Sequence, residues 1–368
     1  MSFLNSVEQY QGFSYSDFFA SLTDAQIEQA IQKSVLGPTD FLTLLSPLAA
    51  NHLEAMAQRA HQLTVQYFGR TIQLFIPLYI SNFCANQCVY CGFNRKNKII
   101  RRKLSLVEIE REAQAISRSG MQHILFLTGE AQQLTPMEYM LDAARCLKRY
   151  FASVAIEVYP LEVEEYRQLM AAGVDSMTLF QECYDQEVYR RVHQAGKKMD
   201  YLFRLNAPER AARAGFRAVN IGALLGLAEP RSEFFLTGIH ARYLEDTFLD
   251  TEVAVSLPRF NECESDFKPD YLVDDPTFVQ FMTALRIFLP RVGITVSTRE
   301  SASFRDSLLP LGVTRYSAGS HTGVGGYERA EEESTPQFEI TDNRAVAEVA
   351  AAIYQHGYQP VYKDWDAI

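Results

Sequence analysis

Three cysteines stand close together in the first quarter of the chain, at Cys84, Cys88 and Cys91, with the spacing C-x3-C-x2-C. They follow an apolar run that reads as a strand. Thiolates select zinc, copper(I) or iron–sulfur centres. A structural zinc ion takes four protein ligands, and no fourth cysteine or close histidine accompanies these three. A [4Fe–4S] cluster held by three cysteines keeps one iron open for another ligand, and the spacing favours such a cluster over three buried small side chains.

The composition predicts a folded globular protein. Hydrophobic residues make up 47% of the 368 residues and aromatic residues 12%, which is too apolar for a disordered chain. A net charge of -10 argues against a nucleic-acid-binding protein. The apolar run at 72–80 is too short to cross a membrane, and the N-terminus has no basic stretch followed by an apolar one. We therefore expect a cytoplasmic protein in which disulfides are rare.

Short apolar runs alternate with longer helical patterns from residue 71 onward. Strands that alternate with helices form right-handed βαβ units and a parallel sheet. Eight such runs predict an α/β fold, the closed (β/α)8 or TIM-type barrel, with a doubly wound open sheet as the alternative. The runs are 72–80, 123–128, 154–159, 176–180, 218–221, 253–257, 294–297 and 314–317. Helical patterns between them include 106–119, 136–150, 162–172 and 207–214.

Helical patterns flank the predicted barrel on both sides. Residues 1–70 predict an N-terminal helical extension, and residues 71–320 the barrel itself. Residues 321–368 would form a C-terminal extension of loop and helix that packs on the barrel. Within that region, 320–337 is rich in Gly, Glu, Ser and Thr and predicts a loop, and a final helix is expected at 343–356.

The cysteine motif has an aromatic residue, Tyr90, directly before its last cysteine, and it resembles that of the radical S-adenosylmethionine (SAM) superfamily. In that superfamily the open iron binds the amino and carboxylate groups of SAM. An electron from the reduced cluster then splits SAM into methionine and a 5′-deoxyadenosyl radical. The resemblance implies a [4Fe–4S] cluster with Cys84, Cys88 and Cys91 as its ligands, and SAM as cosubstrate.

Nearly the whole chain resembles one family of that superfamily, the 2-iminoacetate synthases, which are the tyrosine lyases of thiamine thiazole biosynthesis. Two departures are Cys183, where the family has Thr, and 260–264, which lacks the family's Arg-Pro. The resemblance is therefore weakest in the loop after the sixth strand. The matching stretches are 73–93, 128–130, 156–160, 179–182, 220–227, 256–259, 297–300, 317–320 and 359–366.

The resemblance implies a lyase that breaks the Cα–Cβ bond of L-tyrosine after hydrogen abstraction from its amino group. The products would be 2-iminoacetate (dehydroglycine) and p-cresol, with 5′-deoxyadenosine and methionine from SAM. Implied partners are a flavodoxin- or ferredoxin-type reductant and the thiazole synthase that uses 2-iminoacetate, with no nucleic acid and no membrane. The basic segment 95–103 follows the cysteines and would either dock the reductant or be a solvated loop.

The resemblance also assigns residues to SAM. Tyr90 would lie near the adenine or shield the cluster. Thr128, Gly129 and Glu130 end the second predicted strand and match the glycine-containing motif that binds the amino group of the methionine part. A plain strand-to-helix turn is the alternative for these three residues.

Two charged residues match the positions that hold the rest of SAM. Glu182 would bind the ribose hydroxyls, and Arg204 would grip the carboxylate. An ordinary salt bridge is the alternative for both. Gln181 and Glu157 are weaker candidates of the same kind.

The residues expected to bind the substrate lie at the ends of the last two predicted strands. By resemblance, Arg299 would bind the carboxylate of tyrosine, with Ser317 and Ser320 assisting. A buried arginine needs a partner, and a substrate carboxylate would be one. The alternative is an ion pair of Arg299 with Glu300 or Asp306.

Other readings share the cysteine motif or the fold. The tyrosine lyase of hydrogenase maturation adds a C-terminal domain with cluster cysteines, whereas the last cysteine here is Cys263. Tryptophan lyase and the deazaflavin and menaquinone pathway enzymes differ in the substrate pocket, and biotin synthase would need cysteines for a second cluster. A non-catalytic iron–sulfur or zinc-binding protein has no need of motifs at several strand ends. We interpret three cysteines as structural and assign no role to three histidines: Cys146, Cys183, Cys263, His193, His240 and His321.

Overall fold

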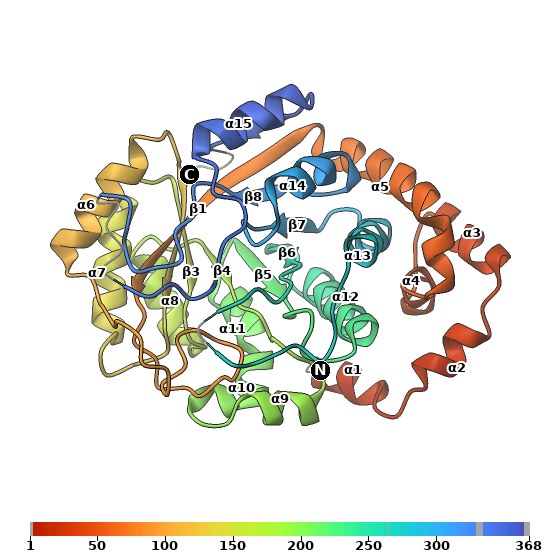
Figure 1. Ribbon diagram of the computed structural model, residues 1–368, viewed down its shortest axis with the longest axis horizontal. Helices are drawn as coiled ribbons and strands as arrows, with labels where there is room; N and C mark the ends of the chain where they lie inside the picture. Colours follow the sequence, from red (N-terminus) through yellow and green to blue (C-terminus); the bar gives the residue numbers. More distant parts are fainter. Residues whose placement is uncertain (1–2, 264, 329–333, 364–368) are drawn as a thin grey trace.

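All eight predicted apolar runs form strands in the computed structural model, which describes residues 3–263, 265–328 and 334–363. The strands are parallel, and the second one pairs with both the first and the third, so the ring of eight is closed. The (β/α)8 prediction is confirmed (Figure 1). The strands are β1 Thr71–Ser81, β2 His123–Thr128, β3 Ser153–Glu157, β4 Ser176–Thr178, β5 Ala218–Gly222, β6 Glu252–Ser256, β7 Gly293–Val296 and β8 Arg315–Ser317.

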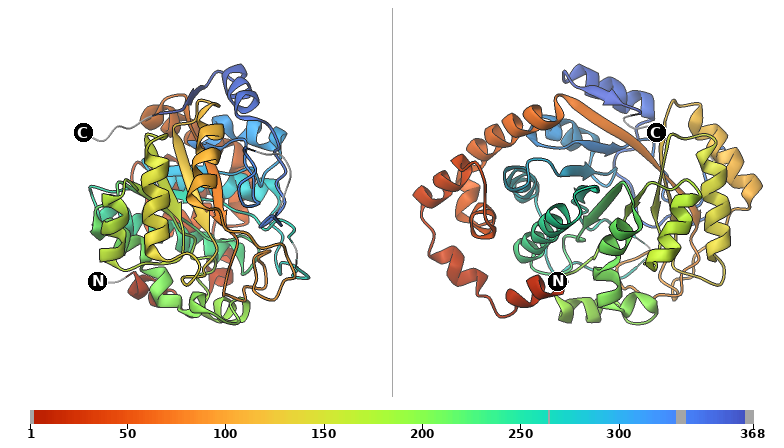
Figure 2. Two further views of the ribbon diagram at one scale, coloured as in Figure 1. Left: turned by 90° about the vertical axis from the view of Figure 1, so that its left-hand side faces the viewer. Right: turned by 180° about the vertical axis from the view of Figure 1, so that it is seen from behind.

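The strands are apolar because helices cover their outer faces and side chains fill the ring. In β1, alternate residues from Ile72 to Leu78 are buried, and Ile76 stands opposite Ile124 of β2. Strands of a parallel sheet that are covered on both faces read as near-continuous hydrophobic runs, as these do. Seen from behind, helices surround the strands (Figure 2).

One or more helices follow each strand. Ser105 caps the first of them, its Oγ accepting the N–H of Glu108 at 3.3 Å. Gly173 and Gly215 end two of these helices with φ of 105° and 100°, a conformation that favours glycine. The helices are α6 Leu106–Ser117, α7 Met137–Lys148, α8 Val163–Ala171, α9 Gln186–Val192, α10 Tyr201–Leu205, α11 Ala207–Ala214, α12 Pro230–Thr247, α13 Asp275–Phe288, α14 Ala302–Leu308 and α15 Val346–Gln355.

The N-terminal helices pack on the outside of the barrel, against α12 and α13 (Figure 1). Phe41 stacks on Phe288 of α13 with 4.4 Å between ring centroids. One continuous hydrophobic core runs from Phe3 to Tyr358. These helices are α1 Leu4–Gln9, α2 Tyr15–Ala20, α3 Asp24–Gln32, α4 Pro38–Leu44 and α5 Leu53–Phe68.

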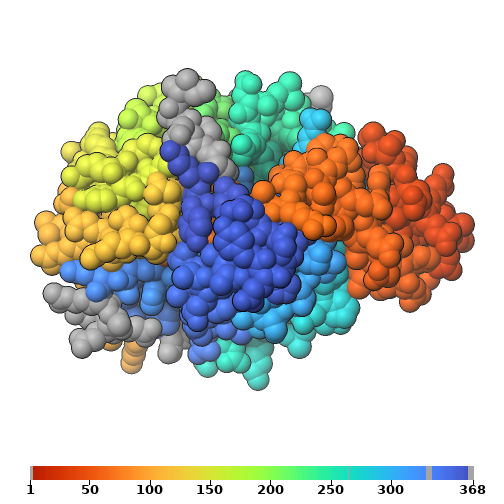
Figure 3. Space-filling model, turned by 90° about the horizontal axis from the view of Figure 1, so that it is seen from above, coloured from red at the N-terminus to blue at the C-terminus, as the bar shows by residue number. Residues whose placement is uncertain are grey.

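The C-terminal region lies beside the N-terminal helices when the molecule is seen from above (Figure 3). It contains a strand that the sequence analysis missed, β9 Gln359–Val361, which pairs with the first residues of β1. The end of the last family-like stretch, from residue 364, lies outside the described residues. The division of the chain at residues 70 and 320 stays a prediction. No helix in the described part of the chain is long and apolar enough to span a membrane.

Candidate functional site

The three clustered cysteines lie on the loop that follows β1, at the end of the barrel where the strands finish. This is the end at which (β/α)8 barrels carry their active sites. Cys88 is buried, Cys84 and Cys91 are half-buried, and all are free thiols. The N–H of Val89 donates to the carbonyl of Val192 at 3.0 Å, so the loop is tied to the last residue of α9.

These thiols fit an iron–sulfur cluster. Burial, followed by the neighbouring Cys84, raises the pKa of the Cys91 thiol to about 11, and burial also raises the pKa of Cys88. In the described residues, no three His, Cys, Asp or Glu side chains converge closely enough to hold one metal ion. A single zinc ion needs that convergence, whereas the iron atoms of a cluster keep their thiolates apart. Bound iron would also supply the positive charge that deprotonates the thiols.

The Tyr90 ring is fixed by a buried histidine. Its hydroxyl donates to Nε2 of His193 at 2.7 Å, and Nδ1 of His193 donates to the carbonyl of Tyr189 at 2.8 Å. Burial, with repulsion from Lys198 and Arg204, lowers the pKa of His193 to about 2, so the ring is neutral. His193 is therefore a packed polar residue that holds Tyr90 at the rim of the cavity described below.

The predicted SAM motif at the end of β2 packs against the cysteine loop. A Cβ on Gly129 would lie 2.4 Å from the carbonyl oxygen of Phe83, so only glycine fits. Glu130 accepts a hydrogen bond from Nδ2 of Asn86 at 2.6 Å. Oγ1 of Thr128 is buried and has no hydrogen-bond partner among the described residues, as expected where a ligand would supply one.

Glu182 and Arg204 meet after β4, together with a residue that the sequence analysis missed, Lys198. Glu182 Oε1 accepts from Lys198 Nζ at 2.6 Å and from Arg204 Nη2 at 3.5 Å, so the salt-bridge alternative is realised here. Burial raises the pKa of Glu182, but the two cations outweigh it and the net shift is downward. Glu182 also has φ of 71°, an uncommon conformation that keeps it a candidate ligand-binding residue. Lys198 follows Lys197 in a polar stretch that gave no signal beyond surface charge.

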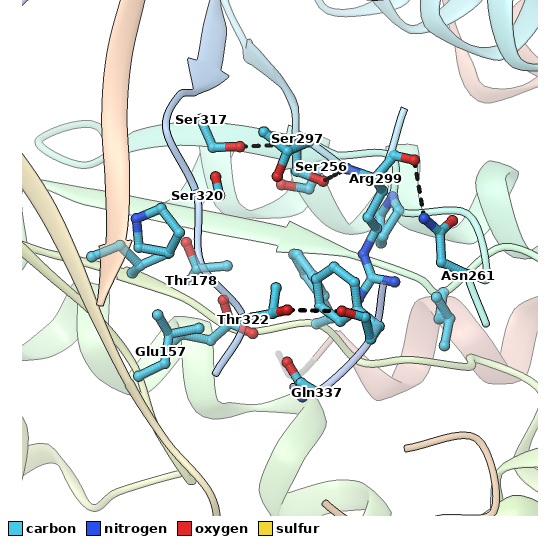
Figure 4. A pocket seen from close by; sticks show the side chains of 18 of the residues that line it. Glu157, Thr178, Ser256, Asn261, Ser297, Arg299, Ser317, Ser320, Thr322 and Gln337 are labelled. Atoms are coloured by element: carbon cyan, nitrogen blue, oxygen red, sulfur yellow. Dashed lines mark hydrogen bonds between the residues drawn. The ribbon is translucent and has the colours of Figure 1, made fainter. Parts of the chain in front are cut away.

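A cavity opens in the mouth of the barrel beside the cysteine loop (Figure 4). It contains about 1090 Å³ of space not filled by protein atoms, part of it open to solvent, which suits small-molecule ligands. The structure brings these predicted residues to its wall: Cys91, Tyr90, Glu157, Glu182, Arg299, Ser317 and Ser320. These predicted residues lie outside that wall: Cys84, Cys88, Thr128, Gly129, Glu130 and Arg204.

Arg299 presents a cation to the cavity without a carboxylate partner in the described residues. Its guanidinium carbon lies 3.4 Å from the ring centroid of Phe338, and Nη1 makes one long contact of 3.5 Å with the carbonyl of Arg259. Glu300 pairs with Arg259, and Asp306 pairs with another arginine at 3.0 Å, so the two predicted alternative partners are taken. Burial lowers the pKa of Arg299, and an anionic ligand would oppose that shift and favour the charged guanidinium.

The two serines differ in what they contact. Ser320 Oγ is buried with no partner among the described residues, whereas Ser317 Oγ accepts the N–H of Thr298 at 3.1 Å. Two further cavity residues, Tyr79 and Gln337, were not predicted from the sequence; the Tyr79 hydroxyl donates to Oε1 of Gln337 at 2.7 Å. Tyr79 reads as one more apolar residue of a strand, and nothing local links Gln337 to the site.

The remaining cysteines and histidines have structural contacts. Cys263 Sγ donates to the carbonyl of Tyr90 at 3.3 Å, and Cys183 Sγ donates to a nearby backbone carbonyl at 3.5 Å. Nδ1 of His240 lies 2.9 Å from the hydroxyl of Tyr184. None of these contacts points to a second cluster.

A closed (β/α)8 barrel with a C-x3-C-x2-C loop after its first strand has the architecture of the radical SAM enzymes. The model of the Radical SAM superfamily matches residues 78–235, and that of the Biotin and Thiamin Synthesis associated domain matches residues 256–359.

Comparison with curated relatives identifies the family within the radical SAM superfamily. The chain is 39% identical to the 2-iminoacetate synthase of Salmonella typhimurium and 40% identical to that of Escherichia coli, with 94% of this chain and 92% of each relative covered. It therefore belongs to the 2-iminoacetate synthase family of radical SAM enzymes. The X-ray structure of HydG, the FeFe-hydrogenase maturase from Carboxydothermus hydrogenoformans, is similar, with a TM-score of 0.91, 33% identity, and 99% of this chain and 86% of that chain covered.

Proposed function

We propose that the protein is a radical SAM lyase that cleaves the Cα–Cβ bond of L-tyrosine to 2-iminoacetate and p-cresol. The observation that carries the proposal is Arg299, a cation that has no carboxylate partner among the described residues and lies in a cavity whose wall includes Cys91 of the cysteine loop. A zwitterionic amino acid supplies the missing carboxylate. The 2-iminoacetate synthases of the family supply the identity of the reaction.

Cys84, Cys88 and Cys91 would hold a [4Fe–4S] cluster. When bound and reduced, it would supply the electron for the reductive cleavage of SAM that starts the radical chemistry at the tyrosine amino group. Glu182, Arg204, Tyr90 and the 128–130 motif would hold SAM. A flavodoxin- or ferredoxin-type protein would provide the electron.

The chain itself orients the substrate and excludes water. Arg299 would bind the tyrosine carboxylate, and the hydroxyl of Ser320, which has no partner among the described residues, would add a hydrogen bond. The apolar wall includes Phe75, Leu125 and Leu127. Such a wall keeps water from the part of the cavity that it lines.

The reductant and the product both imply partners. Arg95, Lys96 and Lys98 are exposed beside the cysteine loop and would face an acidic reductant, whereas Arg101 turns inward to donate to the carbonyl of Asn82 at 2.7 Å. Because 2-iminoacetate hydrolyses readily, we propose direct transfer to the thiazole synthase. The proposal includes a cytoplasmic location, since six free thiols suit a reducing compartment.

The test is an anaerobic assay of reconstituted protein with SAM, dithionite and either L-tyrosine or L-tryptophan. Formation of p-cresol together with 5′-deoxyadenosine, both lost in Cys88→Ala, would support the proposal. Formation of 5′-deoxyadenosine without p-cresol would contradict the tyrosine assignment. Protein that holds a reducible cluster yet forms no 5′-deoxyadenosine would contradict the radical chemistry.

A further inference from the structure

Two charged side chains face each other across the cavity, Glu157 and Arg299 (Figure 4). Glu157 is the last residue of β3, and Arg299 follows β7. In the ring of eight strands, β3 and β7 are four places apart and therefore on opposite sides. The two residues thus place opposite charges on opposite walls of one space.

Neither charge is neutralised by the protein in the part of the chain that the structure describes. The Glu157 carboxylate forms no ion pair or hydrogen bond there, and Arg299 has only its long contact with a carbonyl. The other two charged residues of the wall, Glu182 and Lys198, pair with each other at 2.6 Å. Among the described residues of the wall, Glu157 is therefore the one anion, and Arg299 the one cation, that has no oppositely charged partner.

A gap separates the two charges. Arg299 lowers the pKa of Glu157 and Glu157 raises that of Arg299, so each lies in the other's field, yet they are too far apart for a salt bridge. The Glu157 carboxylate is half-buried and has no partner among the described residues, so it stabilises no other group of the protein and is free to bind a ligand. The placement of the two charges on opposite walls suits a ligand that carries a cation and an anion a few bonds apart.

We propose that Glu157 binds the α-amino group of the amino-acid substrate while Arg299 binds its carboxylate, and that Glu157 accepts one proton from the substrate ammonium. The inference deepens the proposed function and rests on it. In this step one N–H bond of the ammonium breaks, its electron pair stays on nitrogen, and the proton moves to a Glu157 oxygen. No oxidant or reductant is needed. The neutral amine keeps the N–H bonds from which the hydrogen atom is taken.

Binding measurements on the reconstituted holoprotein test the inference, with three ligands that differ in charge. L-Tyrosine has both charged groups, tyramine lacks the carboxylate, and 3-(4-hydroxyphenyl)propanoate lacks the amino group. In Glu157→Gln we expect roughly 10- to 100-fold weaker binding of L-tyrosine and tyramine, with the propanoate unchanged. In Arg299→Gln we expect weaker binding of L-tyrosine and the propanoate, with tyramine unchanged.

Controls separate this role from a structural one. Glu164→Gln, on the exposed face of α8, should bind all three ligands as wild type does. Glu157→Gln should keep its iron content and melting temperature, and Glu157→Asp should recover part of the L-tyrosine affinity. Glu157→Leu is a second variant that should show the same ligand pattern.

Equal effects of Glu157→Gln on all three ligands, or no effect on any, would overturn the inference. Failure of the proposed function is distinguishable from this result. Wild-type protein that makes no p-cresol contradicts the lyase assignment, whereas wild-type protein that makes p-cresol while Glu157→Gln binds L-tyrosine normally contradicts only the role of Glu157.

Discussion

The hydroxyl of Tyr90 lies 2.7 Å from Nε2 of His193 and donates its proton to that neutral ring. The bond joins the cysteine loop to the segment that follows α9. Backbone bonds between the same two segments run alongside it, such as that from the N–H of Gln87 to the carbonyl of Ala195 at 2.9 Å. The position of the loop therefore depends on a contact between residues far apart in the sequence.

We expect Tyr90→Phe to lower the free energy of unfolding by about 1–3 kcal/mol, because it leaves Nε2 of His193 buried without a partner. Denaturant unfolding and the iron content after reconstitution measure the effect. Tyr67→Phe, at a half-exposed ring on α5, should change neither. Unchanged stability of Tyr90→Phe would mean that the bond does not support the loop.

The pair of Glu182 and Lys198 should show strong coupling. Lys198→Met leaves the buried Glu182 carboxylate with the 3.5 Å contact to Arg204 alone, and we expect a loss of about 3 kcal/mol. The double variant Glu182→Gln with Lys198→Met removes both charges and should be more stable than Lys198→Met. Denaturant unfolding of the wild type, the two single variants and the double variant completes a double-mutant cycle. Additive losses of stability would contradict a stabilising ion pair.

Gly129 should be required for cluster assembly. In Gly129→Ala the new Cβ would lie 2.4 Å from the carbonyl of Phe83 and 3.2 Å from Cβ of Cys84, so the loop must move. We expect reconstituted Gly129→Ala to hold less iron and to show weaker visible absorbance. Gly37→Ala makes an ordinary 3.6 Å contact and serves as the control. Full iron content in Gly129→Ala would refute the requirement.

Much of the barrel could be predicted because its signals are local. The helix at 207–214 and the strand at 123–128 were predicted with the bounds they have in the structure. The fourth strand was expected at 176–180 and is assigned only to Thr178, although backbone hydrogen bonds to β5 continue beyond it, from the N–H of Leu179 to the carbonyl of Asn220 and from the N–H of Gln181 to the carbonyl of Gly222. The strand β9 was missed because Pro360 cannot donate to a ladder and weakens its signal.

The functional site, like the fold, could be predicted only where its residues form a local motif. Cys84, Cys88 and Cys91 form a motif within eight residues and could be found by spacing alone. Lys198 and Gln337 could not, since neither belongs to a local motif: Lys198 reaches the site through Glu182, 16 residues away, and Gln337 through Cys91, 246 residues away. The placement of opposite charges on opposite walls of the barrel is a property of the closed ring and has no signature along the sequence.

Gln337 should tune the reduction potential of the cluster. Its Nε2 donates to Sγ of Cys91 at 3.8 Å, and hydrogen bonds to ligand sulfur stabilise the more negative, reduced state. We expect Gln337→Leu to shift the potential to a more negative value, as read from a redox titration followed by electron paramagnetic resonance. Gln355→Leu, on the exposed end of α15, should leave the potential unchanged. A shift to a more positive value would contradict the assigned role.

The affinity for L-tyrosine should rise with pH through the neutral range. Burial, followed by repulsion from Glu182, raises the pKa of Glu157 to about 7, although Arg299, Lys198 and Arg204 oppose the shift. The pKa of Lys198 is raised to about 12 and that of Glu182 is lowered, so Glu157 is the member of this group that titrates near neutrality.

Below its pKa Glu157 is protonated and does not attract the substrate ammonium, and above it the carboxylate does. We therefore expect tighter L-tyrosine binding at about pH 8 than at about pH 6, a difference that Glu157→Gln removes. The same raised pKa stabilises the folded protein at low pH, and that contribution is lost as the pH rises through about 7. Calorimetric titration of the holoprotein at both pH values measures the binding. A pH dependence that survives in Glu157→Gln would assign the titration to another group.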